Sequence, residues 1–409
     1  MGQSLLHATA APAASAAAPS SAAAAGGGAS AGPSGAAYTY RCSKGDGTLN
    51  GAGSTFINPL LSKMAGDYNT LCGVQVNYQS IGSGGGVKAW QQNTVDFGAS
   101  DAYLADSDMA AAAANGTPVE IPVTFGAVVV AYNLSGLSAP LKMTPDVVAG
   151  IFLGKITKWN DPALAAVNPG VNLPSTAISV VHRSDGSGTN SIFTKYLTAV
   201  SPDWVNVVGA GDPTKSAGKT VAWPLGQGAS GNEGVTQGIT GTDGAVGYID
   251  VAYAIQAHYA LFAIKNQAGV FVTPGLRQIT ATANLVTTAK PDSTGLTLNV
   301  VDPPAPSLPT FKPIKGKSAS ERAKILKYRA SVTAKARVKN KKLEIAYPIC
   351  TFTYVIVPEQ ANQADALKTF FQWALTKGQG STFGPPLRFV AIPKAVQKTS
   401  LSLLSRIHS

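Results

Sequence analysis

The sequence predicts an α/β protein, and three observations support this fold class. From about Thr48 onward, short β-rich runs alternate with segments of helical periodicity, which is typical of strands and helices packed in layers. Charged residues make up only 13% of the 409 residues and apolar residues 45%, a balance that excludes a disordered chain or a long coiled coil. The 43 glycines and 26 prolines favour many turns over a helical bundle.

The expected elements follow in chain order. Strands are predicted where short β-rich runs occur, at residues 75–79, 123–131, 178–181, 245–249 and 351–357. Helices are predicted where apolar residues share one face or where caps occur: 59–71, a short helix opened by Thr144-Pro145-Asp146, 191–200, and a helix from Ala364 closed by Lys377-Gly378. No window of 18 consecutive apolar residues occurs, so no transmembrane helix is expected.

The positive charge of the chain is local. The net charge is +11, but twelve of the 32 Lys/Arg residues and only one of the 21 Asp/Glu residues, Glu321, lie between Lys312 and Lys342. The rest therefore has 20 of each and is neutral, which argues against nucleic-acid binding. Ser318 and Glu321 form a capping-box pattern that predicts a basic helix over 320–338. This insertion, about 302–347, is either a solvated element or a contact for a cell-wall polymer or another polyanion.

The N-terminal 37 residues contain sixteen alanines and mostly Gly, Ser and Pro besides. Nothing there can bury a face, so residues 1–47 are expected to be a low-complexity tail. Leu5, Leu6 and the small residues after them are compatible with the end of a truncated signal peptide, but also with a plain linker. Residues 399–409 are expected to be a C-terminal tail.

Three cysteines occur, without a C-x-x-C motif or a Cys/His cluster, so structural zinc is not expected. One disulfide and one thiol would suit an exported protein, and three buried thiols a cytosolic one. If the protein is exported, Cys42 and Cys72 are the preferred pair because they bracket the first loop and helix. Cys350 remains a competing partner.

Three segments place glycine and small hydroxyl residues directly before a helical pattern: 51–56, 81–88 and 183–189. Glycine lets the backbone approach a ligand closely. A helix N-terminus offers free N–H donors and partial positive charge, and Ser and Thr add hydroxyl donors. If the three segments converge, with Arg183 in the third, they would form a site for a tetrahedral oxyanion.

These segments lie in longer strings, GAGSTF, VNYQSIGSGGGVK, VDFGASDAYL, IFLGKITKWNDP, HRSDGSGTNSIFTKYL and GAVGYIDVAYA. In order and spacing they closely resemble the phosphate-binding proteins of ABC-type phosphate uptake systems, a family of type II periplasmic-style solute-binding proteins. The resemblance covers about residues 51–260 and 347–376. It implies a two-lobed type II periplasmic-binding fold, with mixed sheets flanked by helices and a ligand cleft between the lobes.

The resemblance also implies the lobe limits. Lobe one is expected to combine residues 48–122 with 258–398, and lobe two to span 123–257. The chain would cross near 122–124 and 254–258, and closure would be a hinge motion about these segments.

The site residues are carried over from the matching motifs. Thr55 and Phe56 are expected to donate backbone N–H groups, with the Thr55 hydroxyl assisting. Arg183 would supply the one full positive charge, held by Asp185, because its planar fork can address two phosphate oxygens. The remaining donors are expected to be Ser83, Ser187, Gly188 and Thr189.

Asp101 is the one acid of the expected site. A carboxylate beside an anion is repulsive unless the anion brings a proton. Phosphate keeps at least one proton at neutral pH and can donate it to Asp101, whereas sulfate cannot. A buried charged acceptor without a donor is costly, so Asp101 is expected to reject sulfate.

Enzyme motifs are absent from the sequence. Gly218-Lys219-Thr220 lacks the first glycine of a P-loop, since Pro213 stands in its place. No G-x-S-x-G elbow activates Ser187, and the four histidines are scattered, at His7, His182, His258 and His408. We therefore expect no catalytic residues, no cofactor and no metal.

The predicted function is extracytoplasmic capture of inorganic phosphate by a monomer, with delivery to the membrane subunits of an ABC permease and no nucleic-acid partner. Two alternatives remain: a binding protein for another tetrahedral oxyanion, or a cell-surface protein that binds polyanions through the basic insertion. The latter predicts salt-sensitive binding that survives loss of the cleft.

Overall fold

The computed structural model describes residues 42, 47–112, 116–137, 140–291, 296, 298, 300–304, 310–312, 314 and 317–409. The expected N-terminal tail therefore lies almost wholly outside the described residues. No described helix is both long enough and apolar enough to cross a membrane.

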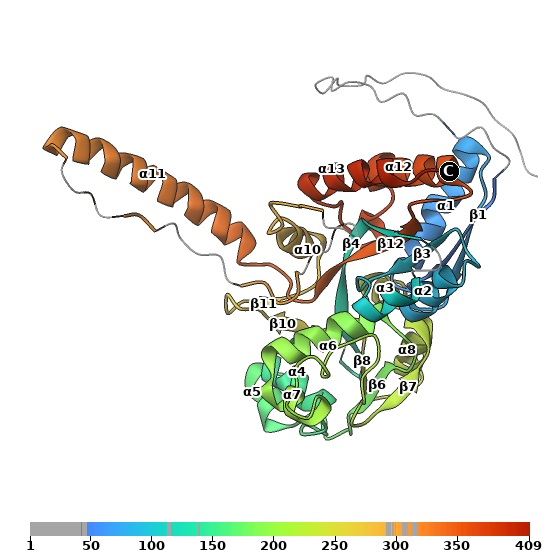
Figure 1. Ribbon diagram of the computed structural model, residues 1–409. Coiled ribbons are helices and arrows are strands. Elements are labelled where there is room, and N and C mark those ends of the chain that lie inside the picture. Colours follow the sequence, from blue (N-terminus) through green and yellow to red (C-terminus); the bar gives the residue numbers. More distant parts are fainter. Residues whose placement is uncertain are drawn as a thin grey trace, which may run out of the picture. The chain divides into compact units, whose positions relative to one another are not determined.

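Strands and helices alternate along the described chain, which confirms the α/β prediction (Figure 1). The strands are β1 (Leu49–Gly53), β2 (Val76–Ser80), β3 (Phe97–Ser100), β4 (Pro118–Asn133), β5 (Lys142–Met143), β6 (Ser179–Arg183), β7 (Gln227–Ala229), β8 (Ala245–Asp250), β9 (Ala260–Leu261), β10 (Ala263–Lys265), β11 (Phe271–Val272) and β12 (Cys350–Pro358). The helices are α1 (Asn58–Cys72), α2 (Ser83–Gln91), α3 (Asp106–Ala112), α4 (Pro145–Phe152), α5 (Pro162–Val167), α6 (Gly188–Val200), α7 (Pro202–Val208), α8 (Gly231–Thr240), α9 (Val251–Gln256), α10 (Leu276–Ala283), α11 (Ala319–Leu343), α12 (Ala364–Thr376) and α13 (Lys394–Leu403).

All five predicted strands and all the predicted helices form. The sequence reading missed the other strands and the helices α3, α5, α7, α8, α9, α10 and α13. Among the missed strands, β1 and β3 are rich in Gly, Ala and Asn, which are uncommon in strands. The expected C-terminal tail differs from the structure, because α13 continues into a short 3-10 turn and Leu403 and Ile407 are buried. These apolar residues give the end of the chain a face to pack.

The main sheet has the strand order β2-β1-β3-β12-β4-β8-β6-β7, with β9 beside β4. β1 runs parallel to β2 and β3, and β6 runs parallel to β7 and β8, whereas β4 is antiparallel to both β12 and β8. We call β2-β1-β3-β12 with residues 118–127 of β4 the first half-sheet. The second half-sheet is β8-β6-β7 with residues 128–133 of β4.

The long strand β4 joins the two half-sheets. The residues of β4 up to Ala127 pair with β12, and those from Val128 onward pair with β8. Further along the chain, β9 pairs with β4 and β10 pairs with β5. Strand pairing does not by itself delimit lobes, so the crossings expected near 122–124 and 254–258 stay a prediction.

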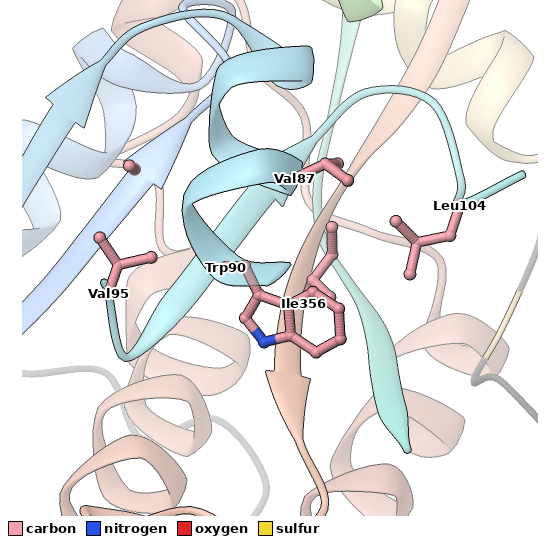
Figure 2. Packing of buried hydrophobic residues seen from close by; sticks show 6 residues of the cluster. Val87, Trp90, Val95, Leu104 and Ile356 are labelled. Atoms are coloured by element: carbon pink, nitrogen blue, oxygen red, sulfur yellow. The ribbon is translucent and has the colours of Figure 1, made fainter. Parts of the chain in front are cut away.

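Helix α2 is held on the first half-sheet by an apolar cluster (Figure 2). Trp90 and Val87 of α2 pack with Ile356 of β12 and with Leu104, and all of them are buried. Burying these side chains contributes about 1.5–3 kcal/mol each, relative to leaving them exposed. The cluster thereby fixes the N-terminal turn of α2, where Ser83 lies.

The basic insertion contains α11, whose Ser318–Glu321 capping box is present as predicted. The helix is longer than expected, and its basic side chains surround it on all sides, without an apolar face. Among the described residues, none of the basic side chains within α11 forms an ion pair with an acid.

Cys42 and Cys72 form a disulfide, with their Cα atoms 5.4 Å apart. This confirms the preferred pairing. Cys350 is a free, buried cysteine whose burial raises the pKa of its thiol.

We therefore expect peptide mapping under non-reducing conditions to recover one cross-linked pair, Cys42 with Cys72. Cys350 should react with an alkylating reagent only after unfolding, because burial blocks access and disfavours the thiolate. Alkylation of all three cysteines without a reductant would contradict this pairing.

Candidate functional site

The loops that were singled out all follow the carboxyl ends of strands. Ser54 and Thr55 follow β1, Ser83 follows β2 and Asp101 follows β3, all in the first half-sheet. In the second half-sheet, residues 184–189 follow β6 and residues 230–232 follow β7. Since ligands of α/β sheets bind outside the carboxyl ends of strands, this edge is where a site is expected.

The loops of the two half-sheets touch each other. The Gly84 N–H donates to the Gly186 carbonyl at 2.7 Å. Gly82 has a positive φ of 82°, and a Cβ there would collide with the carboxylate of Asp185. A Cβ on Gly188 would lie 2.5 Å from both the Ser83 hydroxyl and an Asp101 carboxylate oxygen. The structure therefore brings the second and third loops and Asp101 together.

Arg183 lies at the end of β6 and is only 3% exposed. Its Nε and Nη2 donate to the two carboxylate oxygens of Asp185, at 2.7 and 2.5 Å. Nη1 donates to Thr189 Oγ1 at 3.3 Å. Burial alone would raise the pKa of Asp185, but the hydrogen bonds and charge of Arg183 outweigh it and hold that pKa below its usual value. The pair is thus a charged fork held in one orientation.

Asp101 is 2% exposed and accepts hydrogen bonds from three hydroxyl groups. Ser54 Oγ lies 2.7 Å from each carboxylate oxygen, Thr353 Oγ1 lies 2.7 Å from Oδ1, and Ser83 Oγ lies 3.4 Å from Oδ2. Burial raises the pKa of Asp101 to about 6, against the opposing effect of the Ser54 and Thr353 hydrogen bonds and the charge of Arg183. The carboxyl group therefore gains and loses its proton in a pH range that overlaps the one in which phosphate does so.

The helix N-termini of the site form as the sequence predicted, and some of their N–H and hydroxyl groups already have hydrogen-bond partners within the protein. Ser187 is the N-cap of α6, and its hydroxyl accepts from the Asn190 N–H, while its own N–H donates to the Lys219 carbonyl at 2.9 Å. The Phe56 N–H donates to Ser54 Oγ at 3.0 Å. The N–H of Phe56 is therefore occupied within its own loop.

The sequence reading missed several side chains that contact the expected site residues, among them Ser54, Thr353 and Asn232. Ser54 and Thr353 both donate to Asp101, and Asn232 donates to Thr55. Ser54 lies within the GAGSTF string, and Ala229-Ser230-Gly231-Asn232 is a fourth segment of glycine and small polar residues before a helix, so both could have been found. Thr353 gave no such signal, because it lies inside a buried strand.

Further contacts join the two half-sheets around the site. Lys219 Nζ lies 2.6 Å from an Asp108 carboxylate oxygen on α3, and the Tyr253 hydroxyl donates to the Thr55 carbonyl at 2.9 Å. Glu233 accepts from the hydroxyls of Tyr253 and Ser80, at 2.7 and 3.2 Å. Among the described residues, no group of three or more His, Cys, Asp or Glu side chains could hold a metal ion.

Comparison with known proteins agrees with this architecture. The family model described as the PBP superfamily domain matches residues 33–377. The phosphate-binding protein PstS of Xylella fastidiosa (strain Temecula1) is 35% identical over 354 residues, which cover 86% of this chain and 83% of that protein. The PstS of Pasteurella multocida is 35% identical over 353 residues, which cover 85% of this chain and 87% of that protein.

Among solved structures, a phosphate-binding protein from Stenotrophomonas maltophilia matches with a TM-score of 0.58 at 18% identity, covering 87% of this chain and 93% of that one. This likeness shows the fold, which is the two-lobed α/β fold of type II periplasmic binding proteins. The chain therefore belongs to the PBP superfamily and, within it, to the family of phosphate-binding proteins named PstS.

Proposed function

We propose that the chain binds inorganic phosphate outside the cytoplasm and delivers it to the membrane subunits of an ABC phosphate permease. The observation that carries this proposal is the meeting of loops from both half-sheets beside the buried Arg183, which Asp185 holds, and beside the buried acceptor Asp101. Membership of the PstS family supports phosphate as the anion.

The proposed ligand groups come from helix N-termini, hydroxyls and the guanidinium. The starts of α2 and α6 supply N–H groups and partial positive charge. The Phe56 N–H donates to Ser54 Oγ, so only the resemblance of its motif supports Phe56 as a ligand of the anion. The residues that we place around the anion are Thr55, Phe56, Ser83, Asp101, Arg183, Ser187, Gly188 and Thr189, with Asp185 supporting Arg183.

Asp101 sets which anion is accepted. When it is ionised, its oxygens can bind only a donor, and a protonated phosphate oxygen is one. The three hydroxyls that donate to Asp101 hold it in place without neutralising its charge. Sulfate carries no proton at neutral pH and would leave this buried carboxylate facing an unprotonated oxygen.

Binding rather than catalysis is proposed because the polar groups of the site are held in fixed directions by protein partners. The guanidinium is fixed by Asp185, and the Ser187 hydroxyl caps α6. Fixed donors favour tight capture of an anion, since little side-chain entropy is lost on binding.

The test is isothermal titration calorimetry of the purified protein with phosphate, arsenate and sulfate. Phosphate and arsenate should bind at one site, because both are tetrahedral and keep a proton at neutral pH, and sulfate should not bind. Absence of phosphate binding would refute the proposed function. Equal binding of phosphate and sulfate would leave an oxyanion site but remove the role of Asp101.

The basic helix α11 should not affect phosphate affinity. Replacing its nine Lys/Arg residues with Gln removes charges that have no acidic partner among the described residues, and deleting residues 312–342 also removes the ion pair of Lys317 with Glu321. Exposed charges separated from a site by more than a Debye length, about 8 Å at physiological salt, are largely screened. A clear loss of phosphate affinity on calorimetry would contradict this expectation and place α11 in the binding mechanism.

A further inference from the structure

Two threonine hydroxyls, Thr55 from the first half-sheet and Thr189 from the second, share one hydrogen-bond donor, Asn232. We infer that Asn232 is a positioning residue: by donating to both hydroxyls, it leaves them able only to donate to the bound anion. The anion oxygens that face Thr55 and Thr189 must then be unprotonated. This inference rests on the proposed function and assigns a role to a residue outside the set that we place around the anion.

The orientation of the Asn232 amide follows from its partners. Asn232 is 0% exposed, and its side-chain oxygen Oδ1 lies 3.0 Å from the backbone nitrogen of Asp250. A backbone N–H can only donate, so the atom facing it must be the oxygen. The Nδ2 group is therefore the one that faces the threonines, at 2.8 Å from Thr55 Oγ1 and 3.3 Å from Thr189 Oγ1.

Each threonine oxygen receives two N–H donors. Thr55 Oγ1 accepts from Asn232 Nδ2 and from the Asn232 backbone N–H, at 2.8 and 3.1 Å. Thr189 Oγ1 accepts from Asn232 Nδ2 and from Arg183 Nη1, each at 3.3 Å. A hydroxyl has two acceptor positions and one proton, so on both oxygens only the proton is left. Among the described residues, neither hydroxyl donates to a protein acceptor.

The consequence is a site in which the Thr55 and Thr189 hydroxyls can act only as donors. A free hydroxyl can donate or accept, and would tolerate a ligand N–H or O–H group as well as an oxygen. With their acceptor positions filled, the Thr55 and Thr189 hydroxyls can only donate, and so can bind only an unprotonated oxygen, whereas the Asp101 carboxylate can only accept from a donor. Together they recognise one arrangement of protons on the anion.

The test is a thermodynamic cycle on phosphate affinity. Asn232→Ala in the parent protein should weaken phosphate binding about tenfold, the effect of roughly one hydrogen bond to a charged group. The same substitution in a Thr55→Val, Thr189→Val background should change affinity by less than about twofold or improve it, because the hydroxyls through which Asn232 acts are gone. Equal losses in both backgrounds would overturn the inference, since a purely structural role would persist without the hydroxyls.

Asn232→Asp provides a second variant, because it keeps the acceptor for the Asp250 N–H and the size of the side chain. Its carboxylate would accept from Thr55 and Thr189 and turn their protons away from the anion. The added negative charge lowers phosphate affinity in both backgrounds, so its effect cancels when the two losses of affinity are compared. The loss should still be larger in the parent background than in the Thr55→Val, Thr189→Val background. A loss that is equal in both backgrounds would again refute the inference.

Asn168→Ala is the matched control. Asn168 is also a buried asparagine with several hydrogen bonds, to Lys142 and Leu164, away from the site. It should lower the melting temperature and leave phosphate affinity unchanged. Failure of the parent protein to bind phosphate would refute the proposed function, whereas phosphate binding with an additive cycle would refute only the role of Asn232.

Discussion

Replacing Arg183 with alanine is expected to reduce the affinity for phosphate by about 100-fold or more. Arg183 is the buried cation of the site, and hydrogen bonds to Asp185 and Thr189 hold its guanidinium in place. Each hydrogen bond to a charged group contributes about 1.5–3 kcal/mol, and two such bonds to one anion give a loss of this size. The variant also leaves the Asp185 carboxylate beside the anion without its counter-charge.

Isothermal titration calorimetry measures this loss, with thermal unfolding as a check that the fold survives. Arg183→Lys should be intermediate, because a lysine keeps the charge but cannot hold Asp185 and the anion with a planar fork. Arg322→Ala, an exposed arginine of α11, is the matched control and should bind phosphate as the parent does. If Arg183→Ala titrates like the parent, the anion does not bind at this site.

Replacing Asp101 with asparagine is expected to lower the discrimination against sulfate about 10- to 100-fold. The substitution removes a buried negative charge but keeps the side-chain size, and the amide can donate to an unprotonated oxygen. One buried unsatisfied acceptor costs about 1–3 kcal/mol, and more when it is charged. Phosphate binding should survive, with a weaker dependence on the protonation state of phosphate.

The pH dependence gives an independent test of Asp101. Since burial raises its pKa to about 6, acidification below that value protonates the carboxyl group, which can then donate to sulfate. Sulfate binding to the parent should therefore strengthen as the pH falls through about 6, and binding to Asp101→Asn should not show this change.

The stability of the ligand-free protein should respond in the same range. The pKa of Asp101 is higher in the folded than in the unfolded protein, so the folded state binds more protons between pH 3.8 and about 6. The free energy of unfolding therefore falls as the pH rises through this window, and this contribution should be missing in Asp101→Asn. Asp250, whose pKa burial also raises, adds a fall of the same sign in both proteins.

Asp67→Asn, which changes an exposed aspartate on α1, is the control for these measurements and should leave the anion preference unchanged. If Asp101→Asn still rejects sulfate as strongly as the parent does, Asp101 is not the selector, even if phosphate is the ligand.

The elements that the sequence predicted are those whose signals are local. The amphipathic pattern of α1, the Thr144 cap of α4 and the capping box of α11 each depend on residues within one or two turns. The strands β1 and β3 were missed because they are rich in Gly, Ala and Asn, which are uncommon in strands. Helix α13 carries an amphipathic pattern of its own, with Val396, Ser400 and Leu403 on the buried face, so the sequence held a signal that was overlooked.

The sequence by itself determined which loops bear the donors, and its motifs pointed to Arg183, Asp185 and Asp101. Only the tertiary structure decided which groups those residues meet. Thr353 donates to Asp101 across 252 positions of sequence, and Asn232 reaches Thr55 across 177. Such partners depend on how β12 lies beside β3 and how α8 meets the loop after β1. Local propensity carries no information about packing between distant segments, so the partners of these side chains and the raised pKa of Asp101 appear only when the fold brings these elements together.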